Sequence, residues 1–134
     1  MGIVIDTDVL VRAERAGEGM TLGFARWREY GDAYLSVVTA SELLVGVHRA
    51  DTAARRARRL AFVEAILSAI PVLDVTLGVA RVHARLVAAL PAGARLAAHD
   101  ALIAATALYH GCAVLTRNAR DFERLAGVEV LAFE

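Results

Sequence analysis

The sequence contains no lysine, because all fifteen of its basic residues are arginine. This absence excludes a Schiff-base lysine, a P-loop lysine and a lysine general base. Fifteen acidic residues balance the arginines, so the chain also lacks the net positive charge that holds some proteins to nucleic acid by charge alone. Mechanisms that depend on a lysine are therefore excluded for this chain.

Cysteine and long apolar runs are also scarce. The single cysteine, Cys112, cannot form a disulfide within the chain, and we expect a buried thiol in a reducing cytoplasm. Charge, Pro or Gly interrupts every apolar run before the roughly 20 residues that a membrane helix needs, so we expect no export and no membrane span. With 134 residues and 57% apolar content, the chain is expected to form one globular domain.

Short β-like runs alternate with helical stretches along the chain. Strands are predicted at Gly2–Ile5, Tyr34–Val38, Val72–Val75, Ala113–Thr116 and Val128–Phe133. Helices are predicted at Asp8–Ala16, about Ala40–Arg49, Thr52–Ile70, Leu77–Leu90, Asp100–His110 and Ala119–Leu125, with an amphipathic stretch at Met20–Tyr30. This alternation predicts a mostly parallel sheet with helices on both faces.

Four acidic residues fall at one edge of the predicted sheet. Asp6 follows the first strand, Glu42 lies in the first turn of the helix after the second strand, and Asp121 lies in the first turn after the fourth. Asp100 begins the helix that leads back into the fourth strand, so it lies at the same edge. Because open α/β sheets bind ligands at the carboxyl ends of their strands, we expect these acids to form a site.

The residue types at this edge predict a metal-dependent reaction. Carboxylates gathered in one cleft repel one another unless a cation neutralises them. Oxygen ligands without His or Cys favour Mg²⁺ or Mn²⁺ over zinc. Such an ion can ionise a water and stabilise the oxyanions formed during attack on a phosphodiester. The predicted chemistry is hydrolysis of nucleic acid.

Each acid also has a purely structural interpretation. Thr39-Ala-Ser-Glu42 matches a capping box, in which Glu42 satisfies a backbone donor at the start of a helix. Asn118-Ala-Arg-Asp121 has the same pattern, and an aspartate that follows a strand is often a turn residue. Only the expected convergence of the acids favours function over capping.

Three blocks of the sequence carry a family resemblance. They are IDTDVLV near the start, LSVVTASELLVGV in the middle and HDALIAATALYHGCAVLTRNARDFERLAGVEVL near the end. In that order they resemble the signature blocks of PIN-domain ribonucleases, especially the VapC toxins of bacterial toxin–antitoxin pairs. The resemblance implies a single PIN domain over residues 1–134, with three α/β/α layers around a mostly parallel sheet of about five strands.

The resemblance also implies an activity and partners. The expected protein is a metal-dependent endoribonuclease that cuts tRNA, rRNA or mRNA and inhibits translation or growth. Its expected cofactor is Mg²⁺, which Mn²⁺ can replace. We expect a cognate VapB-like antitoxin and a homodimer in the cytoplasm.

The position of each motif assigns roles to the acids. The predicted catalytic residues are Asp6, Glu42, Asp100 and Asp121. Asp6 and Asp100 are predicted to bind the metal, with Glu42 and Asp121 bound to it directly or through water.

Further residues are predicted to support these acids or the substrate. Thr116 and Asn118 match the Thr-x-Asn pair of the family, which is expected to hold the acids in place. Asp8, which stands where the family often has Asn or Ser, is predicted to lie beside the metal ligands with a capping or dipole role. Arg12 and Arg15, on the first predicted helix, are the predicted RNA contacts.

The sequence leaves some questions open. Arg55, Arg56, Arg58 and Arg59 share one helix face, which is interpreted either as a solvated surface or as a rim that contacts phosphates or a partner. A haloacid-dehalogenase-type phosphatase also begins with a strand and Asp-x-Asp, although it usually needs a lysine that this chain lacks. A PIN-like module that binds RNA without cutting it is the other alternative, and loss of a core acid would signal it.

Overall fold

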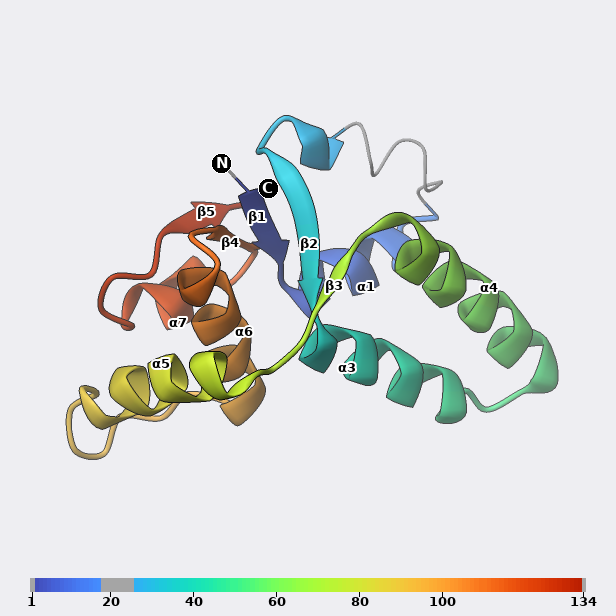
Figure 1. Ribbon diagram of the computed structural model, residues 1–134. Helices are drawn as coiled ribbons and strands as arrows, with labels where there is room; N and C mark the ends of the chain where they lie inside the picture. The colour runs from blue at the N-terminus through green and yellow to red at the C-terminus, as the bar shows by residue number, and fades with distance from the viewer. Residues whose placement is uncertain (1, 18–25, 134) are drawn as a thin grey trace.

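A computed structural model describes residues 2–17 and 26–133 of the chain. Five strands form one sheet in the order β3-β2-β1-β4-β5, and every neighbouring pair is parallel (Figure 1). The strands are β1 (Gly2–Ile5), β2 (Asp32–Ser36), β3 (Val72–Leu73), β4 (Ala113–Thr116) and β5 (Val130–Ala132).

Helices follow or precede the strands as the crossovers of a parallel sheet require. They are α1 (Thr7–Arg15), α3 (Val37–His48), α4 (Ala53–Ala69), α5 (Leu77–Ala88), α6 (Ala98–Tyr109) and α7 (Ala119–Glu123). In the part of the chain that the structure describes, no helix is both long and apolar enough to cross a membrane.

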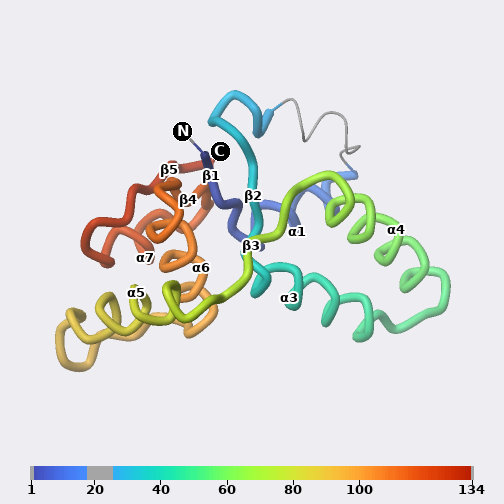
Figure 2. Tube along the Cα trace, viewed as in Figure 1, coloured from blue at the N-terminus to red at the C-terminus, as the bar shows by residue number. Residues whose placement is uncertain are grey.

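The central strand explains the layering. In β1, Ile3 and Ile5 point to one face of the sheet and Val4 to the other, and all three are at most 1% exposed. Ile3 and Ile5 pack in a core with α1, α3 and α4, whereas Val4 packs in a second core with α5, α6 and α7. Figures 1 and 2 show the two helical layers on either side of the sheet. The predicted three-layer α/β/α arrangement with five strands is confirmed.

Some predicted boundaries are wrong, and the second strand matters most. It ends at Ser36 because the Ser36 hydroxyl accepts a hydrogen bond from the Val38 N–H at 3.1 Å and caps α3. Val37 and Val38 therefore begin a helix, although β-branched residues after an apolar run favour a strand.

Two further predictions concern burial. The predicted amphipathic stretch Met20–Tyr30 lies in part outside the described residues, and in its described part Trp27 is 2% exposed. Cys112, expected to be buried, is only partly buried.

Candidate active site at the carboxyl edge of the sheet

The register of the two central strands places Asp6 beside Thr116. Ile5 of β1 pairs with Leu115 of β4, and the Asp6 N–H donates to the Leu115 carbonyl at 2.9 Å. The next residues along each strand then meet through their side chains. The Thr116 hydroxyl donates to Asp6 Oδ2 at 2.8 Å, and both residues are buried. Two segments 110 residues apart thus hold one carboxylate.

Asn118 supports this contact through its backbone. The Asn118 N–H donates to Thr116 Oγ1 at 2.9 Å, which leaves the threonine proton to point at Asp6. The Asn118 side chain makes no cap hydrogen bond to α7. In the Thr-x-Asn motif, the threonine therefore contributes its side chain and the asparagine its main chain.

The hydroxyls of Thr7 and Thr39 orient Glu42. Thr7 Oγ1 lies 2.9 Å from Glu42 Oε1 and 3.0 Å from Thr39 Oγ1. Because an ionised carboxylate only accepts, the Thr7 proton points to Glu42, and the buried Thr39 hydroxyl donates to Thr7. On the other side, His99 Nδ1 lies 3.6 Å from Glu42 Oε2. Glu42 is thus oriented from the first turn of α1 and from the start of α6.

The predicted capping box at Thr39–Glu42 is wrong. Because α3 begins at Val37 with Ser36 as its cap, Glu42 lies in the second turn of the helix rather than the first. The Thr39 hydroxyl bonds Thr7 instead of a helix N–H. The helix start is satisfied without Glu42, so capping does not explain why an acid stands there.

Burial and like charge disfavour ionisation of two of the acids. Burial, with smaller effects from the charges of Asp100 and Asp8, raises the pKa of Asp6 to about 6, although the Thr116 hydroxyl and the Thr7 N–H act against the rise. Burial, followed by the charges of Glu42 and Asp121, also raises the pKa of Asp100, and His99 partly offsets this. This gathering of negative charge costs stability in the free protein.

The electrostatic contacts connect the four predicted acids through Asp100. Its charge acts on Asp6, and the charges of Glu42 and Asp121 act on it. Within residues 2–17 and 26–133, no three His, Cys, Asp or Glu side chains already converge tightly enough to hold one ion. The donors are carboxylates and hydroxyls, and no described arginine is among the groups that shift either pKa. This donor set fits a hard divalent cation.

The Asp8 carboxylate is paired with an arginine rather than gathered with the other acids. Its Oδ2 lies 3.1 Å from Arg12 Nε, one turn further along α1, where the pair is exposed. Asp8 still contributes negative charge near Asp6. Arg12 and Arg15 both line a cavity of about 460 Å³ beside α1.

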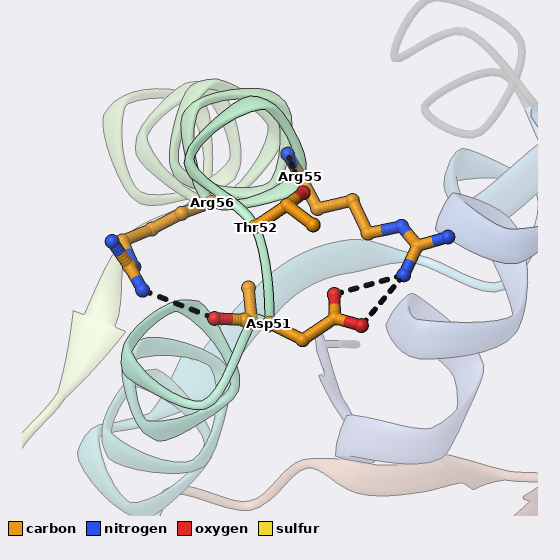
Figure 3. Close-up of polar contacts among 5 residues, drawn as sticks. Asp51, Thr52, Arg55 and Arg56 are labelled. Atoms are coloured by element: carbon orange, nitrogen blue, oxygen red, sulfur yellow. Dashed lines mark hydrogen bonds and ion pairs between the residues drawn. The ribbon is translucent and has the colours of Figure 1, made fainter.

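Most arginines on the arginine-rich face of α4 bind other groups of the protein. Figure 3 shows Arg55 Nη1 bound to both carboxylate oxygens of Asp51, at 2.8 Å each, and Arg56 reaching back to the turn before α4. Arg56 Nη2 donates there to the Ala50 carbonyl at 3.1 Å. These contacts tie the start of α4 to the turn that joins it to α3.

Arg59 makes a further link. It donates to Glu14 Oε1 of α1 at 3.2 Å and to the Gly46 carbonyl of α3 at 2.9 Å, so it joins three helices. Three of the four clustered arginines therefore have structural partners, which favours a structural use of this face over an RNA-contacting rim.

Sequence reasoning missed Thr7 and Thr39 as supports of Glu42. Thr7 is 35 residues from Glu42 and 32 residues from Thr39 along the chain, so no local pattern of residues signals these contacts. A threonine that directly follows a predicted ligand at a strand–helix junction was the only available hint.

Comparisons with known proteins show the family and the fold of the chain. The family model of the PIN domain matches residues 3–128. Ribonuclease VapC1 of Rickettsia felis is 37% identical over 98% of this chain and 96% of its own length. Two solved structures share the fold: VapBC-5 of Mycobacterium tuberculosis, with 30% identity, TM-score 0.74 and 98% of each chain covered, and VapBC2 of Rickettsia felis bound to a promoter DNA fragment, with 18% identity, TM-score 0.87 and 100% covered. With the acids at the carboxyl edge of a five-stranded parallel sheet, the chain belongs to the PIN-domain family and to the VapC ribonucleases within it.

Proposed function

We propose that this chain is the endoribonuclease toxin of a toxin–antitoxin pair, that it depends on Mg²⁺ or Mn²⁺, and that residues 1–134 act as a single PIN domain. The observation that carries the metal dependence is the buried Asp6 carboxylate, which faces the negative charge of Asp100 and is not neutralised by any arginine of the described residues. A protein does not keep such a cluster for stability, because burial and repulsion both oppose it. A bound cation reverses both effects.

Four carboxylates are proposed to serve the metal: Asp6 and Asp100 as ligands, with Glu42 and Asp121 bound directly or through water. When bound, the ion supplies an activated water and stabilises negative charge on the phosphate oxygens. The chain itself supplies orientation. The Thr116 hydroxyl orients Asp6 through Oδ2, and the Thr7 hydroxyl orients Glu42 through Oε1.

The proposed partners follow from the relatives and from the surface. VapBC-5 of Mycobacterium tuberculosis is a member of the VapBC family of toxin–antitoxin systems. Because this chain is similar to it, we propose that this chain also binds a VapB-like antitoxin. Exposed Leu77 and Tyr109, 69% and 50% accessible on the α5–α6 layer, support a homodimer, which the mass in solution tests. We further propose that the enzyme acts in the cytoplasm, on tRNA, rRNA or mRNA.

Cleavage of RNA with and without metal tests the proposal. The wild-type chain should cut a mixed RNA substrate in Mg²⁺ or Mn²⁺, and a chelator should abolish the cut. Asp100→Asn should remove this activity, while Asp51→Asn, which changes an acid that is already paired with Arg55, should leave it intact. Full metal-dependent activity in Asp100→Asn would contradict the assignment of the site.

The alternatives carry less support. A phosphatase of the haloacid-dehalogenase type usually needs a lysine on the transferring phosphate, and the sequence has none. A non-catalytic PIN-like module would lack one of the core acids, whereas Asp6, Glu42 and Asp100 are all present and held near one another.

A further inference from the structure

The cavity beside α1 is rimmed by arginines, and none of the described residues that line it is acidic. Its volume is about 460 Å³, within the range of roughly 300–1,000 Å³ that is common for ligand sites. Four arginines from three separate segments line it: Arg12, Arg15, Arg26 and Arg117. Its remaining walls are apolar and include Val9, Ala13 and Ala16 of α1 and Phe133 after β5. A cavity with this lining suits an anionic ligand that also has an uncharged body.

The cavity adjoins the acidic site. Arg117 directly follows Thr116, whose hydroxyl holds Asp6. On the other side, the Phe133 N–H donates to the Thr116 carbonyl at 2.8 Å, so two walls of the cavity are tied to that residue. Arg117 also lines a neighbouring cavity together with Asp121. The arginine-lined cavity is therefore linked to Asp6 through Thr116, and to the cavity that Asp121 lines through Arg117.

The arginines of this cavity differ from those of α4 in their partners. Arg55, Arg56 and Arg59 are held by carboxylates or carbonyls of the protein. Arg15 and Arg117 are exposed, and no ion pair joins either of them to another described residue. Their guanidinium groups are therefore available to an external anion.

The other two arginines contribute charge in fixed positions. Arg12 binds Asp8 through Nε, and both are partly open to solvent. The guanidinium carbon of Arg26 lies 4.6 Å from the centre of the Phe133 ring, a distance typical of a cation–π contact. Guanidinium groups bind phosphate oxygens in a bidentate manner, which makes them suited to a nucleotide backbone.

We infer that this cavity binds a nucleotide of single-stranded RNA next to the cleaved bond, with its phosphate on Arg15 and Arg117 and its sugar or base over the apolar side of α1. A single strand fits because its nucleotides can enter a concave site one at a time, which a duplex does not allow. The apolar floor distinguishes this ligand from free phosphate. The inference rests on the proposed function and deepens it, because it gives the substrate strand a path past the acids.

Binding of a short single-stranded RNA under chelating conditions, where no cutting is expected, tests the site. A fluorescent oligouridylate is titrated with wild-type protein, with Arg15→Gln/Arg117→Gln, and with a control, Arg81→Gln/Arg85→Gln. The control removes the same charge from α5, on the opposite face of the sheet. We expect the first variant to bind about tenfold more weakly or worse. The slope of log K against log salt should shrink by about 0.7 for each phosphate that the variant no longer binds, whereas the control should keep the wild-type slope.

The outcomes separate this inference from the proposed function. If both double variants bind RNA equally well and wild type still cuts RNA, the cavity is not an RNA subsite, although the nuclease assignment stands. If the first variant loses RNA binding while wild type never cuts RNA in Mg²⁺ or Mn²⁺, the subsite stands and the nuclease assignment fails. If the first variant loses binding to poly-glutamate and keeps binding to RNA, the cavity serves an acidic protein segment and the inference is overturned. Equal melting temperatures of the two variants exclude misfolding as the cause.

Discussion

Carboxylates have opposite surroundings at two places in this molecule. At the start of α4, Asp51 is exposed and meets Arg55 with both of its oxygens at 2.8 Å (Figure 3). At the carboxyl edge of the sheet, Asp6 is 4% exposed and faces the charge of Asp100. The same functional group is paired with an arginine where it is solvated, and is gathered with other acids where it is desolvated.

The difference shows which region the protein keeps for stability and which for function. In the turn before α4, the Asp51 charge is paired with Arg55, and the Thr52 hydroxyl caps the helix by accepting from the Arg55 N–H. The edge of the sheet instead accepts an unfavourable arrangement of acids, which only a ligand such as a cation would relieve. Substitutions in the two regions should therefore have opposite consequences.

The largest expected effect is on catalysis. Asp6→Asn should lower the single-turnover rate of RNA cleavage by about 10²–10³-fold, since the variant loses one charged metal ligand worth several kcal/mol. Asp51→Asn, the same chemical change in the paired region, should stay within about twofold of wild type. Equal losses in both variants would erase the distinction between the two regions.

A smaller effect is expected when the support of an acid is removed. Thr7→Val deletes the hydroxyl that orients Glu42 and should weaken binding of Mn²⁺ by about 10–100-fold, measured by titration with the metal alone. Thr7→Ser, which restores the donor, should recover most of the affinity. Thr52→Val, with the same change of side chain at the α4 cap, should bind Mn²⁺ like wild type. Failure of serine to rescue would mean that Thr7 acts through packing.

The stability of the metal-free protein should respond to pH through Asp6. Its pKa is raised in the folded state to about 6 from 3.8, so the folded protein binds more protons than the unfolded chain between these values. Stability should therefore fall as the pH rises through this window. Asp6→Asn should raise the free energy of unfolding by on the order of 1–3 kcal/mol above about pH 6, and the gain should vanish near pH 4. Denaturant unfolding in chelator, repeated across this pH range, measures the stability of wild type and of Asp6→Asn. If Asp6→Asn is less stable than wild type at neutral pH, Asp6 is a structural residue.

The smallest effects belong to the α4 start. Thr52→Ala should lower stability by about 1 kcal/mol through loss of the cap, and Asp51→Asn by about 0.3–0.5 kcal/mol, a value that added salt should reduce. Thermal unfolding at two salt concentrations checks both. A loss for Asp51→Asn that salt does not change would contradict an exposed, screened ion pair.

Much of the fold is predictable because its signals are local. The runs Gly2–Ile5 and Ala113–Thr116 coincide with β1 and β4, since continuous apolar residues between polar ones are typical of strands buried on both faces. The edge strands are harder to predict. The pattern of residues 128–133 predicts a strand over the whole run, but β5 covers only Val130–Ala132, where fewer neighbours reinforce the local preference.

The site is predictable at the level of residues but not of contacts. The topology of a parallel sheet brings Asp6, Asp100 and Asp121 to one edge, and this follows from the order of the predicted elements. The turn that holds Glu42 is predicted wrongly, because Ser36 and Thr39 are both acceptable helix caps by residue type. Only the course of the chain around β2 decides that Ser36 is the cap.

The sequence by itself determined the family, the fold class and the acidic edge, because apolar periodicity, the order of elements and three motif blocks encode them along the chain. Tertiary structure alone decided which hydroxyls hold the acids and which arginines are available to a ligand. Thr116 meets Asp6 across 110 positions, and Thr7 meets Glu42 across 35. Such contacts depend on strand register and helix packing, which no local pattern of residues specifies.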